Sequence, residues 1–201
     1  MVIGIAGGSC SGKSTLARNL VNLLGGSRTV HISQDNYYKD QSVYSEQERE
    51  KINYDSPAVI DIDLLVQHLS QLIEGRPIKK PIYDFVTHTR VTGYDLVYPE
   101  KDIILEGILI FTDKKLRDLM HLRIFLDITA DIRLARRVSR DTEERGRTPE
   151  LVKKQWFDSV EAMYHKYVVP TKRYADYIFT GYPEHDEIAS LAERIRTGGR
   201  L

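Results

Sequence analysis

The sequence predicts an α/β protein in which a parallel β-sheet is covered by helices on both faces. Short apolar runs alternate with amphipathic stretches along the 201 residues, the pattern of strand–helix–strand units. The runs lack strict polar alternation, as expected for strands that are buried on both faces. A glycine-rich loop at residues 7–15 separates the first run from the first amphipathic stretch. In such a fold, ligands gather at the carboxyl ends of the strands.

The expected elements follow one another in regular order. Behind the glycine-rich loop, leucines repeat at helical spacing until Gly25 and Gly26 end the pattern. The expected strands are residues 2–6, 29–33, 102–105, 122–128 and 177–179. The expected helices are residues 11–24, 60–74, 113–120, 130–145, 149–167 and 184–197.

Residues 78–98 interrupt this alternation. They are rich in β-branched and aromatic residues, with Pro81 and Gly93 as breakers, which indicates a β-hairpin lobe projecting from the sheet. The chain contains no internal repeat, low-complexity tract or linker. We therefore expect one domain over residues 1–201, with the hairpin lobe at 78–98 and a lid at 140–149.

Composition excludes several classes of partner. With 29 basic and 29 acidic residues the formal net charge is zero, so no global field favours nucleic acid or a membrane. The single cysteine, Cys10, excludes an intramolecular disulfide and a cysteine-based zinc site. The chain begins directly with a predicted strand, and no run approaches the ~20 apolar residues of a membrane span. We expect a cytoplasmic protein.

The glycine-rich loop fits the phosphate-binding pattern G-x-x-x-x-G-K-[ST] in full. Backbone N–H groups of such a loop surround phosphate oxygens, Lys13 can reach the β and γ phosphates, and Ser14 can hold Mg²⁺. The alternative is a chance Gly/Ser-rich turn, but the strand before the loop and the helix after it are the context that the motif requires. The predicted nucleotide-binding residues are Gly7, Gly8, Ser9, Cys10, Ser11, Gly12, Lys13, Ser14 and Thr15.

Two carboxylates follow the next predicted strands. Asp35 follows the second strand, where it could accept a proton from an attacking hydroxyl; its alternative role is a turn or helix cap. Glu106 follows the third strand, where it could coordinate a metal; its alternative is a surface glutamate at a strand end. The fold predicts that both lie beside the phosphate loop.

An arginine-rich helix is the third candidate element. Arg133, Arg137 and Arg140 lie on one face, and Leu134 and Val138 mark the apolar side. Guanidinium groups stabilise a phosphoryl group in transfer, but they also form solvated faces with Arg–Glu pairs.

For Arg133 and Arg136 the two readings stay open. Residues 143–149, at the end of this helix and just beyond it, are predicted to form a mobile lid, with Gly146 and Pro149 as its hinges.

Together these residues resemble the uridine kinases of the phosphoribulokinase/uridine kinase family. The stretches that carry the resemblance are 7–15, 34–38, 81–90, 104–109, 131–148 and 170–176. The resemblance implies transfer of the γ-phosphate of ATP or GTP to the 5′-hydroxyl of uridine or cytidine, with Mg²⁺ as cofactor. It also implies a homo-oligomer such as a tetramer.

The resemblance further implies roles for individual residues. Asp35 matches the catalytic base, assisted by Lys13 and Arg140. Asp55 and Arg137 match ribose ligands. Further matches are Tyr83 and His88 for the pyrimidine, Arg140, Arg145 and Arg147 for the lid, Arg147 and Gln155 for the substrate, and Ser14 and Glu106 for Mg²⁺.

Two departures from the family pattern stand out. Where the family commonly has His and a second Asp after the ribose-binding Asp, this chain has Ser56 and Ala58. Cys10 replaces a small residue of the phosphate loop that is often glycine or alanine. Other readings of the motifs are a nucleoside monophosphate kinase, a kinase of another small alcohol such as a sugar phosphate or pantothenate, and a nucleotide-binding regulatory module without catalysis. A GTP-dependent switch is disfavoured because the chain has no Asn-Lys-x-Asp signature.

Overall fold

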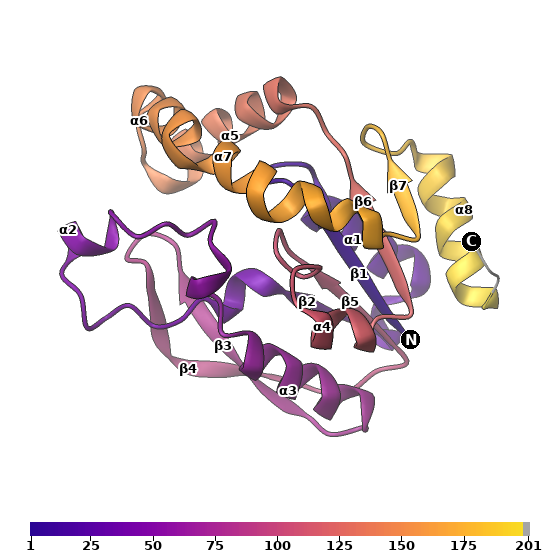
Figure 1. Ribbon diagram of the computed structural model, residues 1–201. Coiled ribbons are helices and arrows are strands. Elements are labelled where there is room, and N and C mark those ends of the chain that lie inside the picture. The colour runs from indigo at the N-terminus through magenta and orange to yellow at the C-terminus, as the bar shows by residue number, and fades with distance from the viewer. Residues whose placement is uncertain (199–201) are drawn as a thin grey trace.

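Five parallel strands form the centre of the protein in the computed structural model, which describes residues 1–198 (Figure 1). Their order across the sheet is β2-β5-β1-β6-β7, and every neighbouring pair is parallel. This confirms the predicted fold class. The strands are β1 (Val2–Gly7), β2 (Thr29–Ser33), β5 (Asp102–Glu106), β6 (Leu122–Leu126) and β7 (Tyr177–Phe179).

The sheet separates two hydrophobic cores. In β1, Ile3 and Ile5 belong to one core, whereas Val2 and Ala6 belong to the other. Because both faces are covered, the strands read as continuous apolar runs. The first core is covered by α1 (Lys13–Leu24) and α8 (His185–Thr197). The second is covered by α3 (Ile62–Ile73), α4 (Lys114–Leu119) and part of the long helix described below.

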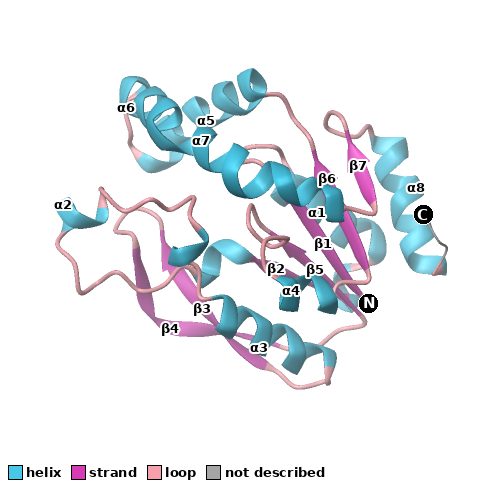
Figure 2. Cartoon of the chain, in the orientation of Figure 1, coloured by secondary structure: helices cyan, strands magenta, loops and turns pink. Residues whose placement is uncertain are grey.

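The predicted hairpin forms a separate two-stranded sheet beside α3 (Figure 2). It consists of β3 (Ile78–Asp84) and β4 (Thr89–Val97), which pair antiparallel with a register shift between Pro81 and Ile82. A short helix that the sequence did not predict, α2 (Glu46–Arg49), lies between β2 and α3. A capping box of Ser45 and Glu48 starts it, a signal that is readable in the sequence.

A long irregular helix crosses the upper part of the molecule. It contains α6 (Pro149–Gln155) and α7 (Glu161–Met163), with π-helical turns at Trp156–Val160 and Tyr164–Val168. A 3₁₀ segment then extends it to Tyr174, beyond the predicted end at residue 167. The helix α5 (Ala130–Arg145) precedes it and has the predicted bounds. A turn at Gly146, with φ of 64°, joins the two.

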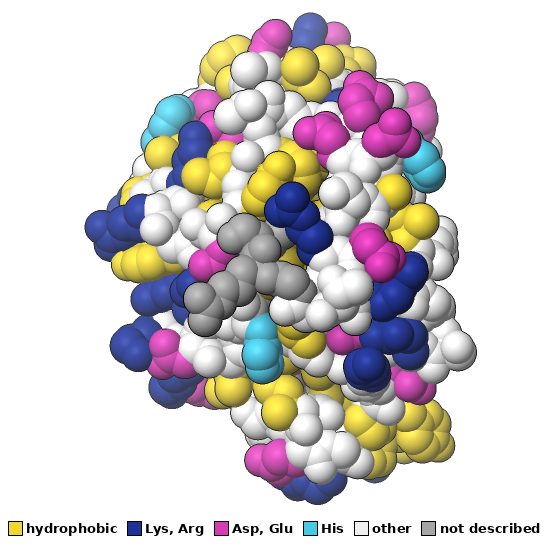
Figure 3. All heavy atoms as spheres, turned by 90° about the vertical axis from the view of Figure 1, so that its right-hand side faces the viewer, with side chains coloured by type: hydrophobic (Ala, Val, Ile, Leu, Met, Phe, Trp, Pro, Cys, Tyr) yellow, Lys and Arg dark blue, Asp and Glu magenta, His cyan; other side chains and the backbone are white. Residues whose placement is uncertain are grey.

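Other boundaries differ slightly from the prediction. The first helix begins at Lys13 instead of residue 11, because Gly12 adopts a left-handed φ of 97°. The strand β6 ends at Leu126, before the chain turns into α5. Within residues 1–198, no helix is both long and apolar enough to cross a membrane. Basic and acidic side chains are interspersed on the face shown in Figure 3, in keeping with the zero net charge.

Candidate active site

The phosphate loop wraps around its own lysine. The Nζ atom of Lys13 donates a hydrogen bond to the carbonyl oxygen of Gly8 at 2.8 Å, and the N–H of Ser11 donates to the same oxygen at 3.2 Å. Burial lowers the pKa of Lys13. At Gly12 a Cβ atom would lie 2.8 Å from the Tyr182 ring, so both the left-handed backbone and the close contact require glycine. A buried ammonium beside a glycine-rich loop at a helix N-terminus favours an anion at this position.

A hydroxyl and a carboxylate meet at the mouth of this loop. The Oγ atom of Ser14, in the first turn of α1, donates to Oε1 of Glu106 at the end of β5 across 3.1 Å. Glu106 is only 4% exposed. Hard oxygen ligands of this kind fit Mg²⁺, which keeps several water or phosphate ligands. Residues 1–198 contain no group of three or more acidic, histidine or cysteine side chains placed to hold an ion.

Asp35 lies on the 3₁₀ turn Gln34–Tyr37 that follows β2. Its N–H donates to Oγ of Ser33 at 3.3 Å, so the turn is capped by the preceding residue. Burial raises the pKa of Asp35, and the nearby Glu106 carboxylate raises it further, while Lys13 opposes both effects. A carboxylate in this environment is a competent proton acceptor.

Gln34 fixes the turn that carries Asp35 through a buried side-chain hydrogen bond. It is fully buried, and its Oε1 accepts the N–H of Leu109, which follows β5, at 2.9 Å. At Gly107 a Cβ atom would lie 2.4 Å from Cβ of Gln34. The turn that carries Asp35 and the loop after β5 therefore touch directly, and only glycine fits between them.

The expected apolar side of α5 is wrong. Leu134 and Val138, expected to mark its apolar side, are only half-buried, and the buried residues of the helix are Arg133, Arg137 and Asp141. A charged stripe instead of an apolar one therefore faces the protein. Apolar spacing alone could not reveal this, because arginine is rarely buried without a partner.

Arg133 packs against the long helix and also lies against Gly8 of the phosphate loop, where its Nη1 has no hydrogen-bond partner among the described residues. It is 1% exposed, and its guanidinium lies over the Tyr164 ring with 3.9 Å between the guanidinium carbon and the ring centroid. Its Nη2 donates to Glu161 at 2.9 Å and its Nε to the carbonyl of Ile128 at 3.0 Å. These contacts tie α5 to the long helix. Arg136 donates to the carbonyl of Ser11 in the phosphate loop at 3.4 Å, so it lies at the nucleotide side.

Asp141 was not predicted to be a site residue. It is completely buried and contacts four arginines, namely Arg137, Arg140, Arg145 and Arg147. Its position four residues after Arg137 and four before Arg145 was the available signal.

An aromatic cluster joins the hairpin lobe to the segment around residue 54. The rings of Tyr54 and His88 stack at 4.3 Å between centroids with an interplanar angle of 15°. Tyr83 is 7% exposed and packs against Tyr38 at 5.0 Å and Phe85 at 5.3 Å. Among the described residues, the hydroxyls of Tyr54 and Tyr83 and Nδ1 of His88 are buried without a hydrogen-bond partner. Such groups are suited to a polar planar ligand. Tyr54 was missed, although it stands directly before Asp55.

The C-terminal end of α5 and the turn after it reach this cluster. Nη2 of Arg147 lies 3.0 Å from Nε2 of His88, and Nη1 of Arg147 donates to Oε1 of Gln155 at 3.1 Å. Since a guanidinium only donates, Nε2 of His88 accepts, and the neutral ring carries its proton on Nδ1. Burial, with Arg147 and Arg145, lowers the pKa of His88 to about 4. The Arg145 guanidinium lies over the Phe85 ring at 4.5 Å.

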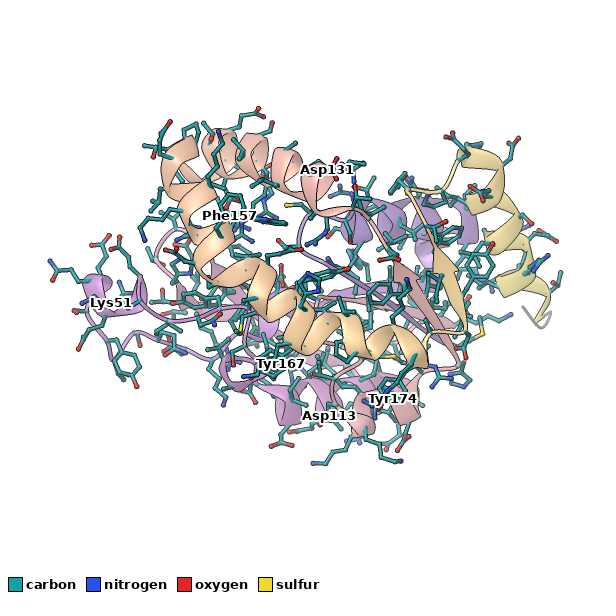
Figure 4. All side chains as sticks on the ribbon, turned by 45° about the horizontal axis from the view of Figure 1, so that its top comes forward. Lys51, Asp113, Asp131, Phe157, Tyr167 and Tyr174 are labelled. Atoms are coloured by element: carbon teal, nitrogen blue, oxygen red, sulfur yellow. The ribbon has the colours of Figure 1, made fainter. Side chains whose placement is uncertain are left out.

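Asp55 and Arg137 interact electrostatically. Burial raises the pKa of Asp55, and Arg137 is the strongest influence opposing that rise. The N–H of Asp55 donates to Oδ1 of Asn53 at 3.1 Å, which fixes the backbone and leaves the carboxylate available. Nη1 of Arg137 donates to Oγ of Ser9 at 3.1 Å. In Figure 4 the long helix runs from near the end of α5 past the Phe157 label to the Tyr167 label, and α5 begins near the Asp131 label.

The parallel sheet, with the phosphate loop between β1 and α1, defines a nucleotide-binding protein of the P-loop class. The chain belongs to the Phosphoribulokinase / Uridine kinase family, whose sequence profile matches residues 2–187. It is 46% identical to a protein named Uridine kinase from Deinococcus deserti, over 98% of this chain and 95% of that one. It is also 46% identical to a Uridine kinase of Bacillus subtilis, over 98% and 94% of the two chains.

Solved structures confirm the fold. A possible uridine kinase from Bacillus stearothermophilus superimposes with a TM-score of 0.61 at 22% identity, covering 89% of this chain and 88% of the other. The phosphoribulokinase from Rhodobacter spheroides gives a TM-score of 0.66 at 16% identity, covering 87% and 67%. At these identities the likeness is one of fold.

Proposed function

We propose that this protein transfers the γ-phosphate of ATP to the 5′-hydroxyl of uridine or cytidine, giving UMP or CMP. Its similarity to proteins named Uridine kinase extends over nearly the whole chain and supports this activity. The observation that carries the proposal is the convergence of the phosphate loop, the half-buried Asp35 and the Ser14–Glu106 pair at one edge of the sheet. The aromatic cluster of Tyr54, Tyr83 and His88 would bind the base of the nucleoside.

In the proposed reaction Asp35 orients the 5′-hydroxyl and accepts its proton. Lys13 and the lid arginines Arg140 and Arg145 stabilise the charge on the phosphoryl group during its transfer. This division of labour relies on positioning and electrostatics without a covalent intermediate. The raised pKa of Asp35 supports its role as the proton acceptor.

Mg²⁺ would be held by Ser14 and Glu106 and would neutralise phosphate charge when bound. The fit rests on their oxygen chemistry and their 3.1 Å separation. ATP is the donor in this proposal, and GTP is the alternative donor to be compared with it.

The nucleoside would be held by two sets of residues. Asp55 and Arg137 suit the vicinal hydroxyls of a ribose, because a carboxylate can accept two hydrogen bonds. Tyr83, His88, Arg147 and Gln155 would hold the base, and Tyr54 joins them through its stacked ring. Aromatic stacking on a base contributes about 1–3 kcal/mol.

A further part of the proposal concerns assembly and location. Tyr94, Leu96 and Tyr98 occupy alternate positions on and just after β4, and each is at least half exposed. Alternate residues share one face of a strand, so these three form an apolar stripe. The stripe supports a homo-oligomer, with a tetramer as the expected form. The lone cysteine fits a reducing, cytoplasmic setting.

The test is a coupled ADP-release assay with Mg²⁺, ATP or GTP, and a panel of acceptors. The panel contains uridine, cytidine, thymidine, adenosine, UMP, pantothenate and ribulose 5-phosphate. Turnover confined to uridine and cytidine is the expected result. Turnover with pantothenate or a sugar phosphate would redirect the proposal to another small alcohol, and ATP binding without turnover would favour a regulatory module.

A further inference from the structure

The C-terminal end of α5 gathers four guanidinium groups around one buried carboxylate. Asp141 lies 2.7 Å from Nη2 of Arg140, and 3.6 Å from Nε of Arg137, Nη1 of Arg145 and Nη1 of Arg147. Burial by itself would raise the pKa of Asp141, but these arginines hold it below its ordinary value. The carboxylate is therefore charged and serves as the shared counter-ion of the cluster.

The backbone of Asp141 also fixes the turn after the helix. Its carbonyl oxygen accepts the N–H of Gly146 and, at 3.1 Å, the N–H of Arg147. The first bond closes the left-handed turn at Gly146, where φ is 64°. The same residue thus sets both the path of the lid backbone and the positions of the lid side chains.

Two of the four arginines lead to different parts of the site. Arg137 continues to the phosphate loop through its 3.1 Å hydrogen bond to Ser9. Arg147 continues to the hairpin through its 3.0 Å contact with His88. Asp141 therefore stands between the nucleotide side and the nucleoside side of the site.

The arginines around Asp141 can exchange their ion-pair partners. Nε of Arg137 and Oδ2 of Asp141 are both buried and without a hydrogen-bond partner in the described part of the chain, although they are only 3.6 Å apart. Arg140 and Arg145 act electrostatically on Asp35, and Arg137 and Arg140 act on Asp55, but neither carboxylate forms an ion pair with them within residues 1–198. Phosphate oxygens can therefore draw Arg140 and Arg145 away while Asp141 tightens on Arg137, because four like charges compete for one carboxylate.

We propose that Asp141 is a positioning residue that couples the nucleotide and nucleoside sites by holding Arg137 and Arg147 in place while Arg140 and Arg145 turn to the phosphates. This role rests on the proposed function of the site. Coupling means that each ligand tightens the binding of the other by the same factor. Without the carboxylate, the guanidiniums repel one another, and each ligand must order its own side of the site alone.

The experiment measures the dissociation constant of a non-hydrolysable ATP analogue with Mg²⁺, with and without saturating uridine, by calorimetry. We expect uridine to tighten analogue binding at least about fivefold in the wild type. In Asp141→Asn this factor should fall below about twofold, and kcat should fall while the exposed control Asp131→Asn retains wild-type coupling. A merely structural role would lower thermal stability and leave the coupling factor unchanged.

A second variant keeps the test decisive if Asp141→Asn lacks a cooperative unfolding transition. Asp141→Glu retains the charge but displaces the carboxylate from its four partners, so its coupling factor should be at least twofold below that of the wild type. Unchanged coupling in the folded variant, or a wild type that binds both ligands independently, would overturn the role of Asp141 and leave the proposed function intact. A wild type that binds the analogue but no nucleoside contradicts the proposed function itself.

Discussion

Oγ of Ser14 lies 3.1 Å from Oε1 of Glu106, so the helix α1 and the strand β5 meet through one hydrogen bond at the phosphate loop. The two residues are 92 positions apart in the sequence. Only the strand order brings them together, because β5 pairs directly with β1 in parallel. The contact is the geometric basis for the proposed Mg²⁺ site.

Replacing Glu106 by Gln should raise the Mg²⁺ concentration needed for half-maximal turnover by about tenfold or more, since a charged oxygen ligand becomes a neutral one. The measurement is a Mg²⁺ titration of the initial rate at saturating ATP. Glu143→Gln is the matched control, because Glu143 accepts a hydrogen bond from Ser139 on the exposed face of α5. An unchanged Mg²⁺ dependence in Glu106→Gln would remove this residue from the metal site.

Replacing Asp35 by Asn should lower kcat by about 10²–10⁴-fold while nucleotide affinity stays within about threefold. The amide keeps the shape of the side chain but cannot accept the proton. Binding is measured by calorimetry with an ATP analogue and turnover by ADP release. Asp63→Asn, at an exposed ion pair with Lys115, should behave as the wild type. Near-normal turnover in Asp35→Asn would exclude the base role.

The fold should lose stability in acid partly through His31. Burial, with nearby Lys80 and Arg18, lowers the pKa of His31 to about 4 in the folded state, against an unfolded value near 6.5. The unfolded chain therefore binds the proton first, so the contribution of His31 is fully present above about pH 6.5 and is lost as the pH falls towards 4. The slope is at most about 1.4 kcal/mol per pH unit, and less here because the side chain is 29% exposed.

Denaturant unfolding at several pH values checks this expectation. His31→Gln should flatten the pH dependence between pH 6.5 and 4 relative to the wild type, whereas the exposed His185→Gln should not. Parallel stability curves for His31→Gln and the wild type would contradict the assignment.

Gly107→Ala should destabilise the protein by about 1–3 kcal/mol, because the new methyl group would lie 2.4 Å from Cβ of Gln34. Displacement of Gln34 also moves the turn that carries Asp35, so kcat should fall with stability. Chemical denaturation and steady-state rates measure both effects. Gly26→Ala meets no atom within 4 Å and is the control. Wild-type activity in Gly107→Ala would show that the turn position does not depend on this contact.

The apolar stripe on the hairpin predicts an assembly larger than the 23.2 kDa chain in sedimentation velocity experiments. Leu96→Lys and Tyr98→Lys should shift the distribution towards the monomer, because buried charge destabilises an apolar interface. Leu151→Lys, at a 45% exposed position on α6, should leave the assembly unchanged. A wild type that sediments as a monomer at micromolar concentration would contradict the expected oligomer.

Much of the fold could be predicted because its signals are local. The glycine-rich loop and the apolar runs identify the strands and helices, and a parallel sheet covered on both faces follows from their alternation. The irregular end of the long helix could not be predicted. Its π-helical turns at Trp156–Val160 and Tyr164–Val168 contain the two rings over which Arg133 of α5 lies, a long-range contact that local sequence does not reveal.

The sequence predicted the position of site residues where a short local motif defines their role, as in the phosphate loop at Lys13 and Ser14. They were missed where the function depends on neighbours distant in the sequence. Asp141 became visible only when the buried face of α5 proved to be charged, and Tyr54 only through its stacking on His88. Cys10, flagged as a departure from the family, adopts a φ of 60°, a conformation that costs a non-glycine residue roughly 1–2 kcal/mol.

The most direct test of the account is to identify the product formed from uridine and ATP labelled in the γ-phosphate. We predict that the label appears in uridine 5′-monophosphate in equal amount to the ADP released, and that Asp35→Asn nearly abolishes both. Label recovered as inorganic phosphate, with no nucleoside monophosphate formed, would contradict the proposed transfer.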